Sequence, residues 1–65
     1  MKLVNAEGQI ALYVTREQLV LLANSVNEAL EALEEWEFPI RLGMEVAEAE
    51  RVSDELSRLI GELPE

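Results

Sequence analysis

Apolar residues form two short runs near the start of the chain, residues 3–4 and residues 10–14, and recur at three- and four-residue spacing later. The early segment is rich in β-branched and aromatic residues, and it predicts a β-hairpin over residues 2–14. Gly8 lies at its centre, where a tight turn requires a positive φ. If Glu7 and Gly8 form a two-residue loop, Leu3 pairs with Leu12. A bulge at Gly8 would shift this pairing by one residue.

Two amphipathic helices follow, the first over residues 16–35 and the second over residues 45–60. Thr15 and Gln18 have the spacing of a capping box, which marks the start of the first helix. Each helix carries one apolar face at helical spacing. The faces comprise Leu19, Leu22, Val26, Leu30 and Leu33 in the first helix, and Val46, Ala49, Val52, Leu56, Leu59 and Ile60 in the second.

The segment between the helices, residues 36–43, predicts an extended connection. Pro39 disfavours helix at the preceding Phe38, and apolar and other residues alternate along the segment. Phe38 is expected in the core, because it is one of few large hydrophobic residues in the chain. Arg41 lies among apolar residues, and a salt bridge to Glu37 or to a helix carboxylate is the simplest account of its charge.

These elements predict an α+β fold in the order ββαα, in which the hairpin packs on an antiparallel two-helix hairpin. Residues 1–65 form a single small domain. A domain of this size has a small core, and a lone hairpin is only marginally stable unless another element packs against it. We therefore expect a homodimer, in which paired hairpins make a four-stranded sheet. The candidate dimer interface consists of Leu3, Ile10, Leu12, Tyr13, Val20 and Leu21.

Charge narrows the class of partner. The chain has 14 acidic and 5 basic residues, a formal net charge of -9, yet 49% of its residues are hydrophobic. Such apolar content is typical of a folded module and not of a disordered acidic tail. Net negative charge disfavours nucleic acid and anionic membranes as partners. It favours a basic protein through electrostatic attraction, although it also serves simply to keep a small protein in solution.

The most acidic stretch, residues 28–37, contains no basic residue and is the expected docking surface for a basic partner. Asn24 and Asn27 are weak helix formers within a helix, which points to specific polar contacts with a partner or with the connecting segment. Trp36 has two interpretations, as the edge of the core or as an interface residue. The candidate partner-binding residues are Asn24, Asn27, Glu28, Glu31, Glu34, Glu35 and Trp36.

No catalytic, cofactor or metal site is expected. The chain has no His and no Cys, which removes the usual nucleophile–base pairs and soft-metal ligands. Carboxylates alone would need a deep cleft or an ordered calcium loop to act as a site. The absence of Cys and of an apolar leader favours a cytoplasmic location.

One stretch resembles a group of small, uncharacterised bacterial proteins. Asn27-Glu28-Ala29-Leu30 matches their N-E-x-[LV] helix, and Glu37-Phe38-Pro39-Ile40-Arg41-Leu42-Gly43 matches their E-F-x-x-R-x-G connection. Some members of the group are immunity-like partners of toxins. The resemblance covers about residues 16–60 and implies a binding protein that is not an enzyme.

The leading hypothesis is therefore a small acidic, non-catalytic binding protein that engages a basic partner such as a toxin, in the manner of an immunity protein or antitoxin. The alternative is a structural or assembly module whose acidic surface only confers solubility.

Overall fold

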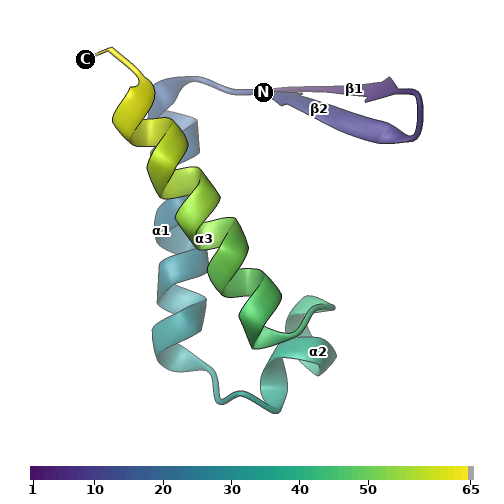
Figure 1. Cartoon of the computed structure of the whole chain (residues 1–65), viewed down its shortest axis with the longest axis vertical. Coiled ribbons are helices and arrows are strands. Elements are labelled where there is room, and N and C mark those ends of the chain that lie inside the picture. The colour runs from purple at the N-terminus through teal and green to yellow at the C-terminus, as the bar shows by residue number, and fades with distance from the viewer. Residues whose placement is uncertain (65) are drawn as a thin grey trace.

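The computed structural model describes residues 1–64 and confirms an α+β composition (Figure 1). It contains one antiparallel two-stranded hairpin and three helices. The elements in chain order are β1 (Lys2–Ala6), β2 (Gln9–Tyr13), α1 (Arg16–Ala32), α2 (Glu37–Leu42) and α3 (Val46–Glu62).

The hairpin forms with the pairing predicted from a two-residue loop. Leu3 lies opposite Leu12, and Glu7 and Gly8 make the turn with φ values of 50° and 87°. Positive φ at both turn residues matches the right-handed twist of the strands, and glycine adopts it without strain. One face of the hairpin therefore carries Leu3, Ile10 and Leu12.

Helix α1 begins at the predicted capping box. The hydroxyl oxygen of Thr15 accepts a hydrogen bond from the Gln18 N–H at 3.1 Å, and the Gln18 side chain accepts one from the Thr15 N–H at 3.0 Å. The helix ends at Ala32, three residues earlier than predicted, because Leu33 adopts an extended conformation.

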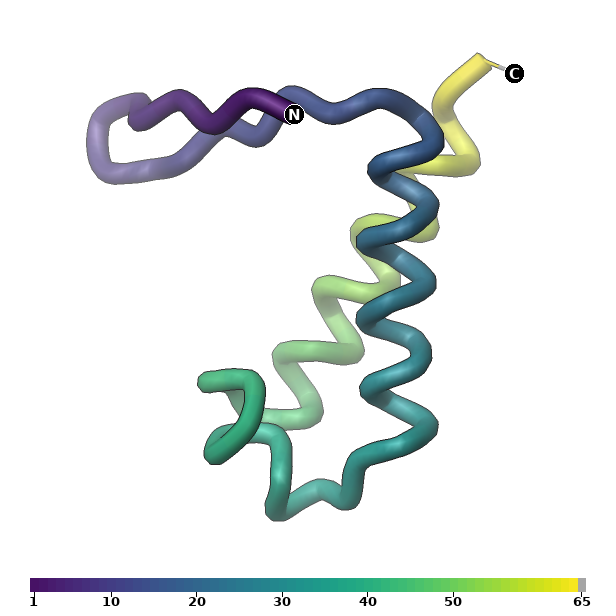
Figure 2. The backbone as a smooth tube through the Cα atoms, turned by 180° about the vertical axis from the view of Figure 1, so that it is seen from behind, coloured from purple at the N-terminus to yellow at the C-terminus, as the bar shows by residue number. Residues whose placement is uncertain are grey.

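Helices α1 and α3 run antiparallel and pack against each other (Figures 1 and 2). Ala23 of α1 is buried, and so are Ala49 and Ser53 of α3. Ser53 bonds Asn27 of α1, and the two alanines each lie one turn before a member of this pair, so small residues lie at the contact. Small side chains allow two helix backbones to approach closely. Phe38 is the largest fully buried side chain, with an exposed fraction of 0%.

The predicted extended connection over residues 36–43 is wrong, because α2 occupies most of it. Pro39 lies in the first turn of α2, where its missing N–H breaks no hydrogen bond within the helix. Phe38 is helical despite preceding a proline, and its complete burial accounts for this departure from local preference. Gly43 ends α2 with a φ of 76°, in the left-handed region that favours glycine.

The prediction that the hairpin packs on the helix pair is also wrong. The hairpin projects from the start of α1, and α2 projects on the same side from the other end of the helix pair, so that the molecule is C-shaped (Figures 1 and 2). Thr15 caps α1 in an extended conformation, with φ -74° and ψ 166°, and the strands continue away from the helix. The apolar face of the hairpin consequently stays open.

Two global dimensions reflect this open shape. The chain exposes 5250 Å², whereas a compact protein of 7.3 kDa exposes about 4,200 Å². The Cα radius of gyration is 13.0 Å, compared with about 11 Å for a compact chain of 65 residues. An isolated subunit thus leaves roughly 1,000 Å² more surface in water than its mass requires.

Candidate functional site

A hydrogen-bonded turn joins α1 to α3 through α2, and we call residues 33–43 the α2 corner. The Glu37 carboxylate organises it by accepting two hydrogen bonds, from the Glu34 N–H at 3.1 Å and from Nε of Arg41 at 2.8 Å. The hydrogen bond from the Glu34 N–H lowers the pKa of the Glu37 carboxyl below its ordinary value, and the Arg41 guanidinium lowers it further. The predicted Glu37–Arg41 salt bridge is therefore confirmed.

Backbone hydrogen bonds and burial hold the corner further. The Glu37 N–H donates to the Glu34 carbonyl at 2.9 Å, and the Phe38 N–H donates to the Glu35 carbonyl at 3.3 Å. Phe38 fixes α2 to the rest of the protein because its side chain is fully buried, which confirms its expected place in the core. The E-F-x-x-R-x-G spacing thus has a local structural meaning: an ion pair, a buried anchor and a helix-ending glycine.

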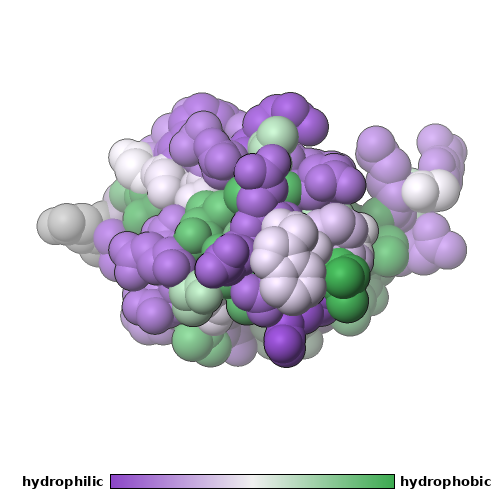
Figure 3. All heavy atoms as spheres, turned by 90° about the horizontal axis from the view of Figure 1, so that it is seen from below, coloured by the Kyte–Doolittle hydropathy of each residue, from purple (hydrophilic) through white to green (hydrophobic). Residues whose placement is uncertain are grey.

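The outer surface of the α2 corner carries large apolar side chains. Trp36 is 65% exposed and Ile40 is 75% exposed, and Leu42 is also exposed. Viewed from this end, apolar (green) and near-neutral (white) side chains lie among hydrophilic (purple) ones (Figure 3). The sequence left two interpretations of Trp36 open, and its exposure places it on the surface and not at the edge of the core.

Several acidic residues of α1 and the α2 corner come shortly before Trp36 in the chain. Glu28, Glu31, Glu34 and Glu35 are all exposed, and the last turn of α1 holds no basic residue. The C-terminal end of a helix carries a partial negative charge, so acidic residues there oppose the helix dipole. Their placement therefore does not stabilise α1.

The structure gives Asn27 a role within the molecule. Its Oδ1 atom accepts a hydrogen bond of 2.7 Å from the hydroxyl of the buried Ser53, and this bond links α1 to α3. The sequence predicted a contact with a partner or with the connecting segment, whereas the contact observed within the molecule is with α3. Asn24 is exposed on α1.

Sequence reasoning missed Ile40 and Leu42 as surface residues. Their alternation with polar residues suggested an extended segment along the core, whereas α2 turns Ile40 outward. The sequence did contain one signal for a helix in this segment, because Glu37 and Arg41 have the i, i+4 spacing of an ion pair on a helical turn.

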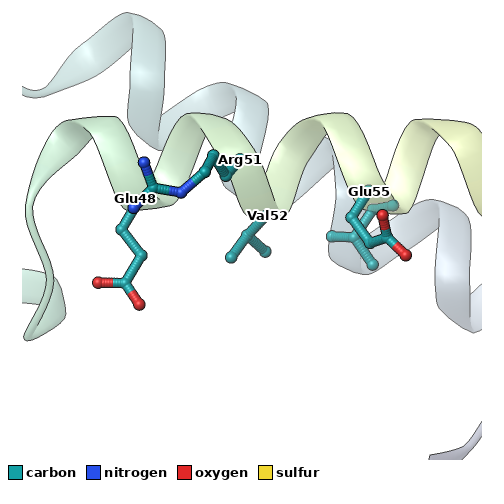
Figure 4. Close-up of a pocket in the computed structure, with 5 residues that line it drawn as sticks. Glu48, Arg51, Val52 and Glu55 are labelled. Atoms are coloured by element: carbon teal, nitrogen blue, oxygen red, sulfur yellow. The ribbon is translucent and has the colours of Figure 1, made fainter.

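A second feature is an open pocket of about 300 Å³ on α3, lined by Glu48, Arg51, Val52, Glu55 and Leu56. Glu48, Val52 and Glu55 point to one side of α3 (Figure 4). Arg58 lies one turn after Glu55 on α3 and forms ion pairs with Glu55 and Glu62. The hydrogen bond and positive charge of Arg58 lower the pKa of the Glu55 carboxyl.

No protein-family model, curated protein or solved structure matches the chain. Within residues 1–64, no group of three or more acidic side chains has an arrangement that could hold a metal ion. None of the helices described has the length and apolar character that a membrane crossing requires.

The Asn27–Ser53 hydrogen bond yields a test of the α1–α3 contact. Asn27→Ala is expected to lower the free energy of unfolding by about 1 kcal/mol, because the buried Ser53 hydroxyl loses its partner. The double variant Asn27→Ala/Ser53→Ala should be no less stable than Ser53→Ala alone, since nothing buried is left unpaired. Urea unfolding of the four proteins at one concentration measures the coupling. Strictly additive effects would show that the bond contributes nothing.

Proposed function

We propose that this chain is a small, non-catalytic protein-binding module that uses the α2 corner and the acidic end of α1 to engage a basic protein. The observation that carries the proposal is the 65% exposure of Trp36 on a corner held by Phe38 and Glu37. Tryptophan is enriched among the residues that dominate binding energy at protein interfaces.

Rigidity supports this assignment. A side chain presented by a hydrogen-bonded corner loses little conformational freedom on binding, so more of the contact energy appears as affinity. Exposed glutamates around an apolar centre form the polar rim that interfaces commonly show. Their charge accelerates encounter with a basic surface and selects against acidic ones.

An immunity-like role toward a basic toxin is the particular form of this function that the resemblance suggests. The competing function is an assembly module in which the acidic residues only confer solubility. The large exposed surface of the isolated subunit is the observation that favours this second function. The two differ in whether the α2 corner recognises a protein other than a copy of the chain.

Affinity capture with matched variants tests the proposal. We expect the immobilised wild-type chain to retain a defined basic protein from source-cell lysate, identified by mass spectrometry and then purified. Trp36→Ala should weaken binding of that purified protein by about 30-fold or more, which is the loss of 2 kcal/mol typical of an interface anchor. Glu31→Lys/Glu34→Lys should also weaken binding, and more strongly at low salt.

The matched control changes charge elsewhere. Glu50 and Asp54 are exposed on α3, outside residues 33–43 and outside α1, and Glu50→Lys/Asp54→Lys alters net charge by the same amount. This variant should retain most of the affinity. Capture that is equal for Trp36→Ala and wild type, or equal loss with both charge variants, would contradict a specific corner interface. Failure of every variant and of wild type to retain a basic protein would favour the assembly function.

A further inference from the structure

The hairpin and α3 leave apolar surface open that the proposed binding corner does not use. On the hairpin, Ile10 is 72% exposed, and Leu3 and Leu12, on the same face, are exposed as well. A two-stranded hairpin is marginally stable in water unless a further element covers it. The hairpin therefore needs a covering surface, and within the chain the helix pair does not supply it (Figure 1).

Helix α3 presents a complementary apolar stripe. Val52 and Leu59 are partly exposed at helical spacing along α3, and Leu63 follows at its end. The pocket at Val52 and Leu56 is a hollow in this stripe. Figure 2 shows that the first half of α3 (green) lies on the open side of the C, between the hairpin and α2, whereas its C-terminal end (yellow) crosses behind α1.

The excess exposed surface of the isolated subunit is similar in area to one side of a standard dimer interface. The isolated subunit exposes 5250 Å², about 1,000 Å² above the value for a compact chain of its mass. Stable specific interfaces bury about 800 Å² on each partner. A single further copy per subunit is therefore sufficient to remove the excess.

Charge distribution favours a contact that involves the hairpin. The hairpin, residues 2–13, holds one basic and one acidic residue, whereas residues 14–65 hold four basic and thirteen acidic residues. The hairpin is thus the part of a negative molecule that has no net charge. Two acidic helix pairs repel each other, while a hairpin meets the acidic helices of another copy without that repulsion.

We infer that the chain forms a reciprocal dimer in which the hairpin of each copy lies across α3 of the other. The Leu3, Ile10 and Leu12 face contacts the apolar stripe of α3. The contact occurs twice around one two-fold axis, so both open faces are covered at once and the assembly closes. The α2 corner remains outside this contact.

Disulfide trapping tests the arrangement directly, because the chain has no cysteine of its own. Ile10→Cys and Val52→Cys are made in separate proteins, one of which carries a mass tag, and both are checked for wild-type helicity. Both positions are exposed, so the substitutions leave the core intact. The proteins are mixed, equilibrated and oxidised mildly, and the products are separated by mass. Light scattering of the unmodified chain at high micromolar concentration measures its size.

We expect a dimer of the unmodified chain and a mixed Ile10–Val52 product at least fivefold more abundant than either self-linked product. A predominant Ile10–Ile10 product would overturn the arrangement and indicate hairpin-to-hairpin pairing instead. A 7.3 kDa particle at high micromolar concentration would overturn the dimer itself. Neither result bears on capture of a basic protein by the α2 corner.

Discussion

Replacing Phe38 with alanine is expected to unfold the helical part of the protein at room temperature. Phe38 is fully buried and is the largest such side chain, so its removal leaves a cavity at the point where α2 meets the helix pair. Phenylalanine-to-alanine changes in a core lower stability by about 3–5 kcal/mol. That loss equals roughly the whole stability, about 3–5 kcal/mol, that a single small core supplies. Circular dichroism and urea unfolding at a fixed protein concentration measure the effect.

The matched control lies two residues away in the same short helix. Ile40 is 75% exposed, so Ile40→Ala removes a large side chain without opening a cavity. Its free energy of unfolding should stay within about 0.5 kcal/mol of wild type. Equal stability of Phe38→Ala and wild type would show that the corner does not depend on this anchor, and the rigidity argument for the binding site would fail with it.

Ala49→Leu is the second change with a large expected effect. Ala49 is 3% exposed on the α1-facing side of α3, where a small side chain allows the helices to approach. Additional methylene groups in a close-packed contact force side chains off their rotamers or push the helices apart, which lowers stability by about 1–3 kcal/mol. The urea midpoint of the variant should fall accordingly.

Ala47→Leu is the control for Ala49→Leu. Ala47 lies in the first turn of the same helix and is exposed, and the two changes are equal in size and in helix propensity. The stability of Ala47→Leu should differ from wild type by about 0.5 kcal/mol or less. If both variants lost stability equally, the loss would reflect a property of leucine in α3 and not the closeness of α1 and α3.

Local signals predicted the hairpin and the two long helices well. The turn residues Glu7 and Gly8 specify their own loop, and the loop specifies the pairing of Leu3 with Leu12. The capping box at Thr15 specifies where α1 begins. Each of these signals acts between residues that are close in the chain, so each can be interpreted before the fold is known.

The candidate site was predicted only in part. The exposure of Trp36 and the hydrogen bond from Ser53 to Asn27 depend on which side of α1 faces α3. Periodicity alone does not decide whether a residue at the edge of the apolar face of a helix is buried or exposed. Helix α2 was missed because the rule for residues before proline competes with burial of Phe38, and burial gives the larger free energy.

The sequence by itself determined the hairpin turn, the helix faces and the negative charge, because all three follow from short-range geometry or from composition. Tertiary structure alone decided that the hairpin projects from the helices, that Phe38 is buried while Trp36 faces the solvent, and that Asn27 bonds Ser53. The physical reason is that these outcomes depend on competition between surfaces for burial. Such competition is resolved only when segments distant in the chain meet, and here a 65-residue chain has too little interior to cover every apolar face.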